Sequence, residues 1–240
     1  MANPLDQLVR KLQQAYGESL ISVVLYGSAA DGEHQPKYSD FNVLCVLDSI
    51  TPRELAAGEE LFHWWRGEGN PSPLLLTEPE IAASTDCFVI EFLDIQRQHR
   101  LLHGKDVISG LVIDRERGAS LYRVQVERDL RARLLRLRQK AAGMMSDRDL
   151  LRRLLADSVS TFCVLFRHVL ALRGVDVPPR KREIIRRAAD CFGLDGQPFE
   201  QLLDLREERQ TPRQVDPWKV LAPYLEGIGK AIAAVDGLQE

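Results

Sequence analysis

The fold of this chain is decided by residues 20–47, which read LISVVLYGS over 20–28 and, after eleven further residues, DFNVLCVL over 40–47. Both apolar runs are typical of strands, the first being rich in β-branched residues, and Gly27-Ser28 ends the first run abruptly. Glycine lets the backbone turn tightly and approach a ligand closely, because it has no Cβ atom. The pattern therefore predicts two strands joined by a loop that begins with a Gly-Ser turn.

The polar residues at the ends of these strands form a candidate site for a phosphate and a metal. Ser28 offers a hydroxyl and a backbone amide that suit a phosphate oxygen, and Lys37 in the loop is a further candidate for phosphate contact. Asp40 and Asn42 are two residues apart on a predicted strand, so their side chains point to one face. Two oxygen ligands beside a phosphate-binding turn suit Mg²⁺. We therefore expect phosphate binding at Gly27, Ser28 and Lys37, and metal binding at Asp40 and Asn42.

The segments around this motif alternate between helical and strand patterns. Residues 4–18 carry leucines at helical spacing, and residues 51–67 open with a Thr-Pro-Arg-Glu helix start. The sequence Pro-Ser-Pro at 71–73 then breaks the chain before a short apolar run at 74–76. Strands separated by helices predict an α/β or α+β unit.

The second half of the sequence is entirely helical in pattern. Apolar side chains in residues 126–137 repeat at intervals of four, four and three, and residues 151–169 carry one apolar face. We therefore expect two domains, an α+β domain at 1–114 and an all-α helical bundle domain at 115–240.

The Gly-Ser motif resembles that of the nucleotidyltransferase superfamily, which includes DNA polymerase beta, kanamycin nucleotidyltransferase and small stand-alone nucleotidyltransferases. In that superfamily an apolar strand ends in Gly-Ser or Gly-Gly, and Asp-x-Asp or Asp-x-Glu opens the next strand. Gly27, Ser28 and Asp40 match this pattern, with apolar flanks. The resemblance implies a nucleotidyltransferase-type mixed sheet followed by a helical domain, as in antibiotic-modifying relatives. It also implies Mg²⁺ and nucleotide binding at these residues, with ATP expected as the nucleoside triphosphate.

Asn42 departs from the superfamily pattern, because active members carry a second carboxylate at that position. An amide oxygen can coordinate Mg²⁺, but it brings no negative charge, and a missing charge at the short separations of a metal site is costly. Two-metal phosphoryl chemistry depends on such charges to hold its cations. Asp40 is therefore the candidate catalytic carboxylate, and Asn42 puts turnover in question without abolishing nucleotide binding.

The superfamily also has a third carboxylate on a later strand, often the base that activates the acceptor hydroxyl. If that strand is 74–77, it offers no carboxylate before Glu78. If it is 88–94, Glu91 or Asp94 could serve, but not both, because they point to opposite faces of a strand. The apolar residues of this segment also keep helical spacing, so the pattern leaves strand and helix open. Glu91 is the candidate catalytic residue.

Positive charge is concentrated in the middle of the chain, although the 240 residues contain 32 Lys or Arg, 35 Asp or Glu and a formal net charge of −3. Residues 115–153 contain 12 Lys or Arg and 5 Asp or Glu, a local net charge of +7, and a second basic cluster lies at 180–187. Basic patches attract polyanions, from nucleic acids to nucleotide phosphates. A solvated arginine face on helices is the commoner reading, so the charge alone does not establish a nucleic-acid partner.

Two other features are weaker indications of a site. His99 and His103 are four residues apart and could share a helix face as metal ligands, but no acidic or cysteine partner lies at useful spacing. Trp64 and Trp65 offer an aromatic surface for a base, although an amphipathic helix that buries one indole is the simpler interpretation.

Two functions compete on this sequence. The first is a Mg²⁺-dependent nucleotidyltransferase that moves a nucleoside monophosphate from a nucleoside triphosphate to an acceptor, which could be a small molecule, a nucleic acid or a protein. The alternative is a catalytically degenerate member that binds nucleotide or a partner without turnover, as Asn42 suggests. A third hypothesis, a helical nucleic-acid binder, rests only on the arginine patch.

The sequence also bears on cellular location. No uninterrupted apolar stretch approaches the roughly 18 residues that a membrane helix needs. Residues 1–11 carry Asp6, Arg10 and Lys11 where a secretion signal would have an apolar core. We therefore expect a soluble cytoplasmic protein with no membrane partner; the oligomeric state is open.

Overall fold

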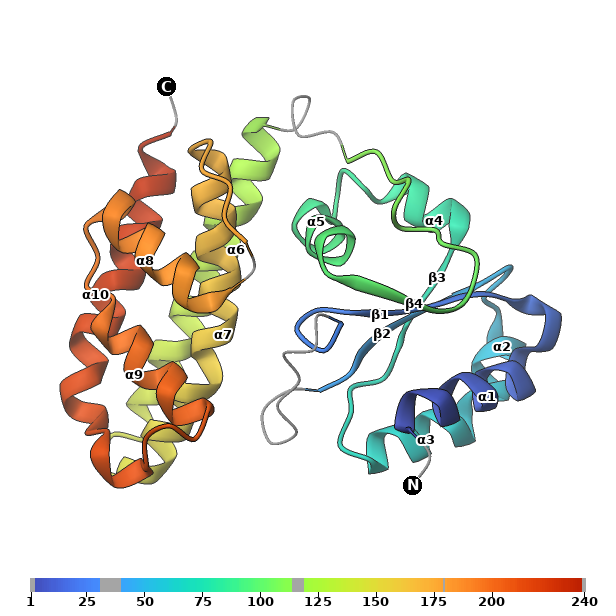
Figure 1. The fold of residues 1–240 in the computed structure, drawn as a ribbon, viewed down its shortest axis with the longest axis horizontal. Coiled ribbons are helices and arrows are strands. Elements are labelled where there is room, and N and C mark those ends of the chain that lie inside the picture. Colours follow the sequence, from blue (N-terminus) through green and yellow to red (C-terminus); the bar gives the residue numbers. More distant parts are fainter. Residues whose placement is uncertain (1–2, 31–39, 114–118, 179, 239–240) are drawn as a thin grey trace. The chain divides into compact units, whose positions relative to one another are not determined.

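The chain divides into two compact units, residues 1–114 and 115–240, which Figure 1 shows in colours that follow the sequence. The computed structural model describes residues 3–30, 40–113, 119–178 and 180–238. The first unit is a mixed sheet with helices, and the second unit is helical. The fold class predicted from the sequence, an α+β unit followed by a helical bundle, is confirmed.

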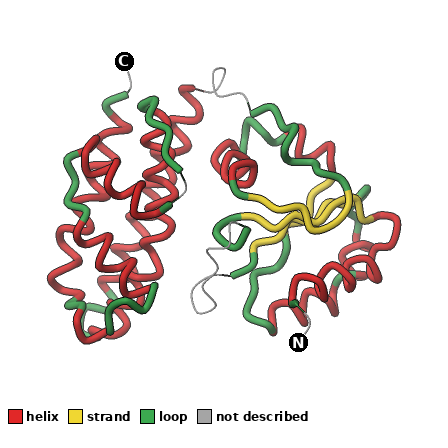
Figure 2. The backbone as a smooth tube through the Cα atoms, in the orientation of Figure 1, coloured by secondary structure: helices red, strands yellow, loops and turns green. Residues whose placement is uncertain are grey.

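Four strands form one mixed sheet in the first unit, drawn in yellow in Figure 2. They are β1 (Leu20–Tyr26), β2 (Asn42–Leu47), β3 (Leu74–Thr77) and β4 (His99–Gly104), in the spatial order β3-β2-β1-β4. Strand β1 pairs antiparallel with both β2 and β4, and β2 pairs parallel with β3. Most side chains of β1 and β2 are buried, because helices cover both faces of the sheet. This burial explains why both strands read as continuous apolar runs.

The helices of the first unit form two cores, one on each face of the sheet (Figure 1). They are α1 (Pro4–Tyr16), η1 (Gly17–Ser19), α2 (Pro52–Ala57), α3 (Glu59–Gly67), α4 (Glu78–Ala83) and α5 (Val89–Arg97). Helices α1 and α3 bury Leu8, Leu12 and Trp65 in one core. Helices α4 and α5 bury Ile81 and Phe92 in the other. Both faces of the central strands are therefore covered by amphipathic helices.

The single helix predicted over 51–67 is two helices, α2 and α3, divided at Gly58. A Cβ atom at Gly58 would lie 2.2 Å from Tyr16 Oη and 2.6 Å from Phe62 Cε2, so close packing against α1 requires glycine here. Glycine is also a weak helix former, which favours the break.

Residues 88–94 lie in and just before α5, so the interpretation of this segment as a strand is wrong. Phe92 and Ile95 of α5 pack into the core on one face of the sheet, which is what their helical spacing allows. The fourth strand comes instead from residues 99–104, where the sequence suggested a helix face carrying two histidines.

The second unit is a bundle built around one central helix. Its elements are α6 (Ala119–Ala142), α7 (Arg148–Leu172), α8 (Lys181–Phe192), α9 (Gln197–Arg206), η2 (Pro212–Gln214) and α10 (Pro217–Asp236). Aromatic rings from three helices meet in its core: Phe166 of α7 lies 5.3 Å from Phe199 of α9, which lies 4.7 Å from Tyr224 of α10, between ring centroids. These contacts tie the later helices to α7.

Helix α7 is the one described helix whose length and composition would also allow it to cross a membrane. Its most apolar window has a mean hydropathy of 1.4, and 61% of that window is buried inside the structure. The central helix of a bundle has the same composition, because it must be apolar around most of its circumference.

Candidate functional site

The Gly-Ser turn at the end of β1 is held by backbone hydrogen bonds. Gly27 has a φ of +78°, a left-handed conformation that favours glycine. Its N–H donates to the carbonyl of Gln98 at 2.9 Å, and its carbonyl accepts from the N–H of Ala30 at 2.9 Å. A Cβ atom at this position would lie 3.5 Å from Asn42 Nδ2. The turn therefore brings bare backbone close to the start of β2.

Asp40 and Asn42 lie where the chain enters β2. Asp40 is exposed, and Asn42 is half-buried and stands opposite Tyr26 in the antiparallel pairing of β1 and β2. The predicted entry of the second strand next to the Gly-Ser turn is therefore present, with Asn42 as the first residue of the strand. The structure thus brings Gly27 and Asn42 together.

Two residues from outside the motif hold the segment between Asp40 and Asn42. The N–H of Phe41 donates to Asn70 Oδ1 at 3.1 Å, and the Phe41 ring stacks on Trp65 with centroids 6.1 Å apart. Trp65 is fully buried, as expected for one of the two adjacent tryptophans. Sequence reasoning missed this role for Asn70, and no local pattern signals it, because the contact joins residues 29 positions apart.

Glu91 lies on a helix and not on a strand. It lies in the first turn of α5. The pKa of Tyr26 is raised mainly because Tyr26 is buried, and the negative charge of Glu91 raises it further. Tyr26 is the last residue of β1 and the cross-strand neighbour of Asn42. Cross-strand neighbours share a face of a sheet. Glu91 is therefore within electrostatic range of Tyr26, the cross-strand neighbour of Asn42.

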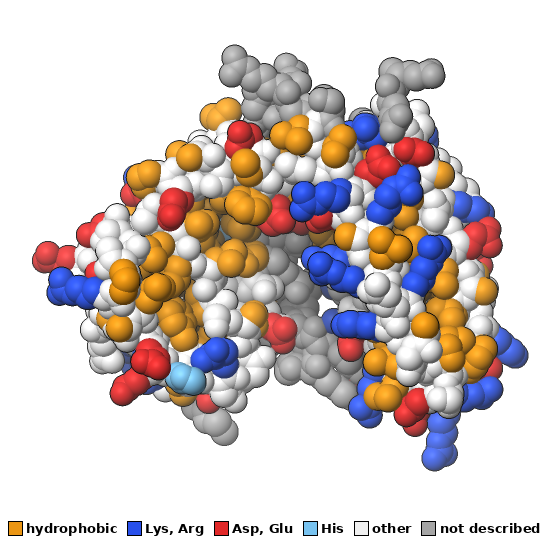
Figure 3. Space-filling model, turned by 180° about the vertical axis from the view of Figure 1, so that it is seen from behind, with side chains coloured by type: hydrophobic (Ala, Val, Ile, Leu, Met, Phe, Trp, Pro, Cys, Tyr) orange, Lys and Arg blue, Asp and Glu red, His pale blue; other side chains and the backbone are white. Residues whose placement is uncertain are grey.

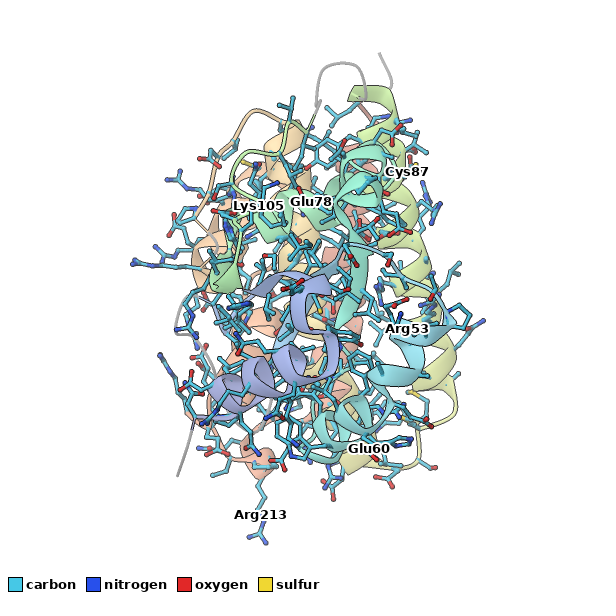
Figure 4. All side chains as sticks on the ribbon, turned by 90° about the vertical axis from the view of Figure 1, so that its right-hand side faces the viewer. Arg53, Glu60, Glu78, Cys87, Lys105 and Arg213 are labelled. Atoms are coloured by element: carbon cyan, nitrogen blue, oxygen red, sulfur yellow. The ribbon has the colours of Figure 1, made fainter. Side chains whose placement is uncertain are left out.

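None of the four strands carries a carboxylate of its own, as their residues show. Strand β3 runs parallel to β2 and begins with Leu74, opposite Leu44. Its pairing therefore does not reach back to Asn42. Glu78, which follows β3, pairs with Lys105 at 2.5 Å, and the two side chains point toward each other in Figure 4. In the described part of the chain, Glu91 therefore stays the candidate for the third carboxylate.

The donor set at Asp40 and Asn42 fits one Mg²⁺ ion. Among the residues that the structure describes, no group of three or more His, Cys, Asp or Glu could hold a metal. Mg²⁺ is commonly held by one or two carboxylates together with substrate phosphates, and it keeps several waters. One carboxylate and one amide oxygen suit an ion that arrives with a triphosphate, but they fall short of what two adjacent ions need.

The two histidines of β4 point to different faces of the sheet and do not form a metal pair. The pairing of β1 with β4 shifts between Val23 and Val24, which reverses the alternation of side chains along β4. His99 lies 3.3 Å from Ser109 Oγ and 3.8 Å from Asp106, whereas His103 lies against Gln13 of α1. Hydrogen bonds, the strongest from Ser109, lower the pKa of Asp106 to about 2.

Lys37, predicted to contact phosphate, lies at 31–39, outside the described residues. The described site therefore consists of the Gly27-Ser28 turn, the Asp40–Asn42 entry to β2, and Glu91 on α5.

Comparison with known sequences agrees with this geometry. Residues 5–103 match the family of the nucleotidyltransferase domain, a segment that runs from α1 into β4 and includes the Gly27 turn. No curated protein matches the chain.

The arrangement of helices and strands is similar to that of a solved enzyme structure. That structure is the spectinomycin adenyltransferase AAD(9) from Enterococcus faecialis, crystallised with ATP and spectinomycin. The similarity has a TM-score of 0.59 and covers 97% of this chain and 98% of that chain, with 14% sequence identity. At this identity the likeness establishes the fold, and the resemblance seen in the sequence to the nucleotidyltransferase superfamily is confirmed.

Proposed function

We propose that the protein moves a nucleoside monophosphate from a nucleoside triphosphate to an acceptor hydroxyl, because residues 5–103 match the family of the nucleotidyltransferase domain. The observation that carries the proposal is that the left-handed turn at Gly27 lies beside the entry to β2, where a Cβ atom on Gly27 would lie 3.5 Å from Asn42 Nδ2. Glu91 on α5, whose charge acts on Tyr26 next to that turn, is the proposed third carboxylate.

Each residue has a separate task in this proposal. The Gly27-Ser28 backbone and the Ser28 hydroxyl bind the triphosphate. Asp40 and Asn42 hold one Mg²⁺ ion, which when bound offsets the negative charge of the phosphates. Glu91 accepts the proton of the acceptor hydroxyl while the oxygen of that hydroxyl bonds to the α-phosphorus of the nucleotide. The bond from that phosphorus to the bridging oxygen breaks, and pyrophosphate leaves.

The nucleotide and the acceptor are the finer parts of the proposal. ATP is the first nucleotide to test, because the structurally similar adenyltransferase was solved with ATP. The acceptor is to be identified by screening small molecules, nucleic acids and proteins. We propose a cytoplasmic reaction, in keeping with the consumption of a nucleoside triphosphate.

Asn42 supports a second candidate, a nucleotide-binding protein with little or no turnover. Its amide replaces a charge that would strengthen the hold on the metal. The two candidates share nucleotide binding and differ in whether pyrophosphate is released.

Calorimetric titration tests the binding that both candidates require. ATP, GTP, CTP and UTP are titrated into the full-length protein, with and without Mg²⁺, and into Asp40→Ala. The matched control is Asp48→Ala, which removes an exposed carboxylate just after the opposite end of β2. We expect Mg²⁺-dependent binding that Asp40→Ala loses and Asp48→Ala keeps. Equal binding by all three proteins would contradict the assignment of the metal to Asp40.

Asn42→Asp separates the enzyme from the non-catalytic protein. If wild type releases pyrophosphate and Asp40→Ala does not, the protein is an enzyme. If wild type binds nucleotide without turnover and Asn42→Asp gains Mg²⁺ affinity, the missing charge is the reason. If no nucleotide binds under any condition, both candidates are wrong.

A further inference from the structure

A pocket of about 240 Å³ opens between α6 and α7 in the helical unit. We call it the α6–α7 pocket. Its cationic lining is Arg133, Arg136 and Lys140, all from α6. The rest of its lining comes from Leu137 of α6 and from α7, which contributes apolar residues, two hydroxyls and one carboxylate.

The three cations lie on one face of α6, because they are separated by three and four residues. At 1.5 Å of rise per residue, Arg133 and Lys140 are about 10 Å apart along the helix axis. In the part of the chain that the structure describes, none of the three has an ion-pair partner, whereas Arg123 and Arg131 of the same helix pair with Glu127. None of these three positive charges is therefore held in an ion pair within the described residues.

The opposite wall offers both apolar and polar contacts. Leu154 and Phe162 of α7 line the pocket, and Thr161 adds a hydroxyl. Asp157 also lines it, but lies 3.8 Å from Arg206 of α9, which offsets its charge. An anionic ligand would therefore meet three cations and an apolar wall, with little repulsion.

The basic cluster of α8 differs, because three of its arginines are already paired. Arg182 of α8 contacts Asp204 and Glu207 at 2.6 Å each, and Arg186 and Arg187 both contact Glu183 at 3.1 Å. Figure 3 shows Lys and Arg side chains gathered on the helical unit in that view, interspersed with Asp and Glu. Unpaired positive charge confined to a row about 10 Å long suits a compact ligand better than a nucleic-acid track.

We propose that the α6–α7 pocket binds a small organic molecule with two phosphate groups, one near each end of the row of cations. Arginine is suited to this task, because its planar guanidinium donates two parallel hydrogen bonds to a phosphate. The apolar wall formed by Leu154 and Phe162 covers the body of the ligand. This inference depends only on the helical unit, so it stands or falls independently of the proposed nucleotidyl transfer.

The test measures binding to the full-length protein by calorimetry, with fructose 1,6-bisphosphate as the probe and inorganic phosphate as its one-group counterpart. The variants are Arg136→Gln and Lys140→Gln. The control is Arg138→Gln, which removes an exposed arginine of the same helix that does not line the pocket. A matched thermal transition for all variants shows that they are folded.

We expect the bisphosphate to bind more tightly than inorganic phosphate. Each pocket variant should weaken bisphosphate binding by about tenfold or more, because it removes one charge-assisted hydrogen bond. Arg138→Gln should bind as wild type does. Three results would overturn the proposal: no binding of the bisphosphate, equal binding of inorganic phosphate, or equal weakening by Arg138→Gln. Salt-dependent binding of a short single-stranded RNA, weakened equally at all three positions, would instead identify a nucleic-acid surface.

Discussion

Replacing Gly27 with alanine tests whether the left-handed turn is part of the binding site. Alanine at a φ of +78° costs about 1–2 kcal/mol, because its Cβ crowds the following carbonyl. The added atom itself would lie 3.5 Å from Asn42 Nδ2, an ordinary contact, so overlap adds little to this cost. We therefore expect a moderate loss of stability in the first unit, together with a loss of nucleotide affinity of at least about tenfold.

Gly174 provides the matched control. It has a φ of +74°, and a Cβ atom there would meet nothing within 4 Å. Gly174→Ala should therefore cost the same 1–2 kcal/mol or so, since the backbone strain is the same, but in the helical unit. Nucleotide affinity should be unchanged, because Gly174 is remote from the motif in sequence and lies in the other unit.

The assay combines denaturant unfolding with calorimetric titration of ATP and Mg²⁺. We expect Gly27→Ala to bind nucleotide at least about tenfold more weakly than wild type, since a displaced turn misaligns its phosphate donors and one well-placed hydrogen bond to a charged group is worth that much. Wild-type affinity in Gly27→Ala, measured on folded protein, would refute the argument that phosphate approaches the bare backbone of the turn. An equal loss of affinity in Gly174→Ala would also refute it, since strain alone would then explain the effect.

Three further predictions follow from contacts away from the turn. Asn70→Ala removes the acceptor of the Phe41 N–H, so it should lower the free energy of unfolding by about 1 kcal/mol and weaken nucleotide binding. Asn70→Asp keeps an acceptor and should restore both the stability and the binding. Unchanged nucleotide binding in Asn70→Ala would contradict the positioning role of Asn70. Tyr122→Phe removes a buried 2.7 Å hydrogen bond to His168 and should destabilise the helical unit by about 1–3 kcal/mol, measured by denaturant unfolding. An unchanged free energy of unfolding would contradict a stabilising role for this hydrogen bond. The pKa of Asp106 is lowered to about 2, so the ionised carboxylate stabilises the fold above about pH 4, and this stabilisation is lost as the pH falls toward 2. The difference in free energy of unfolding between wild type and Asp106→Asn should therefore narrow over that range. A constant difference would contradict the prediction.

Much of the first unit could be predicted because its information is local. The strands on either side of the Gly-Ser turn are short apolar runs bounded by turn residues, and the first is rich in β-branched residues, which favours a strand over a helix. The break at Gly58 was not predictable, because it depends on contact with Tyr16 of another helix. Residues 88–94 were ambiguous for a related reason, since a short apolar run fits a strand or a helix equally well.

The sequence by itself determined the position of the Gly27 turn, the Asp40–Asn42 entry to the second strand, and the helical character of the second half. These depend on residue type and on spacing along the chain. Only the tertiary structure decided that Glu91 lies on a helix, that Asn70 holds Phe41, and that the α6–α7 pocket keeps unpaired cations. Each of these depends on which distant segments pack together, and the spacing of residues along one segment does not encode that choice.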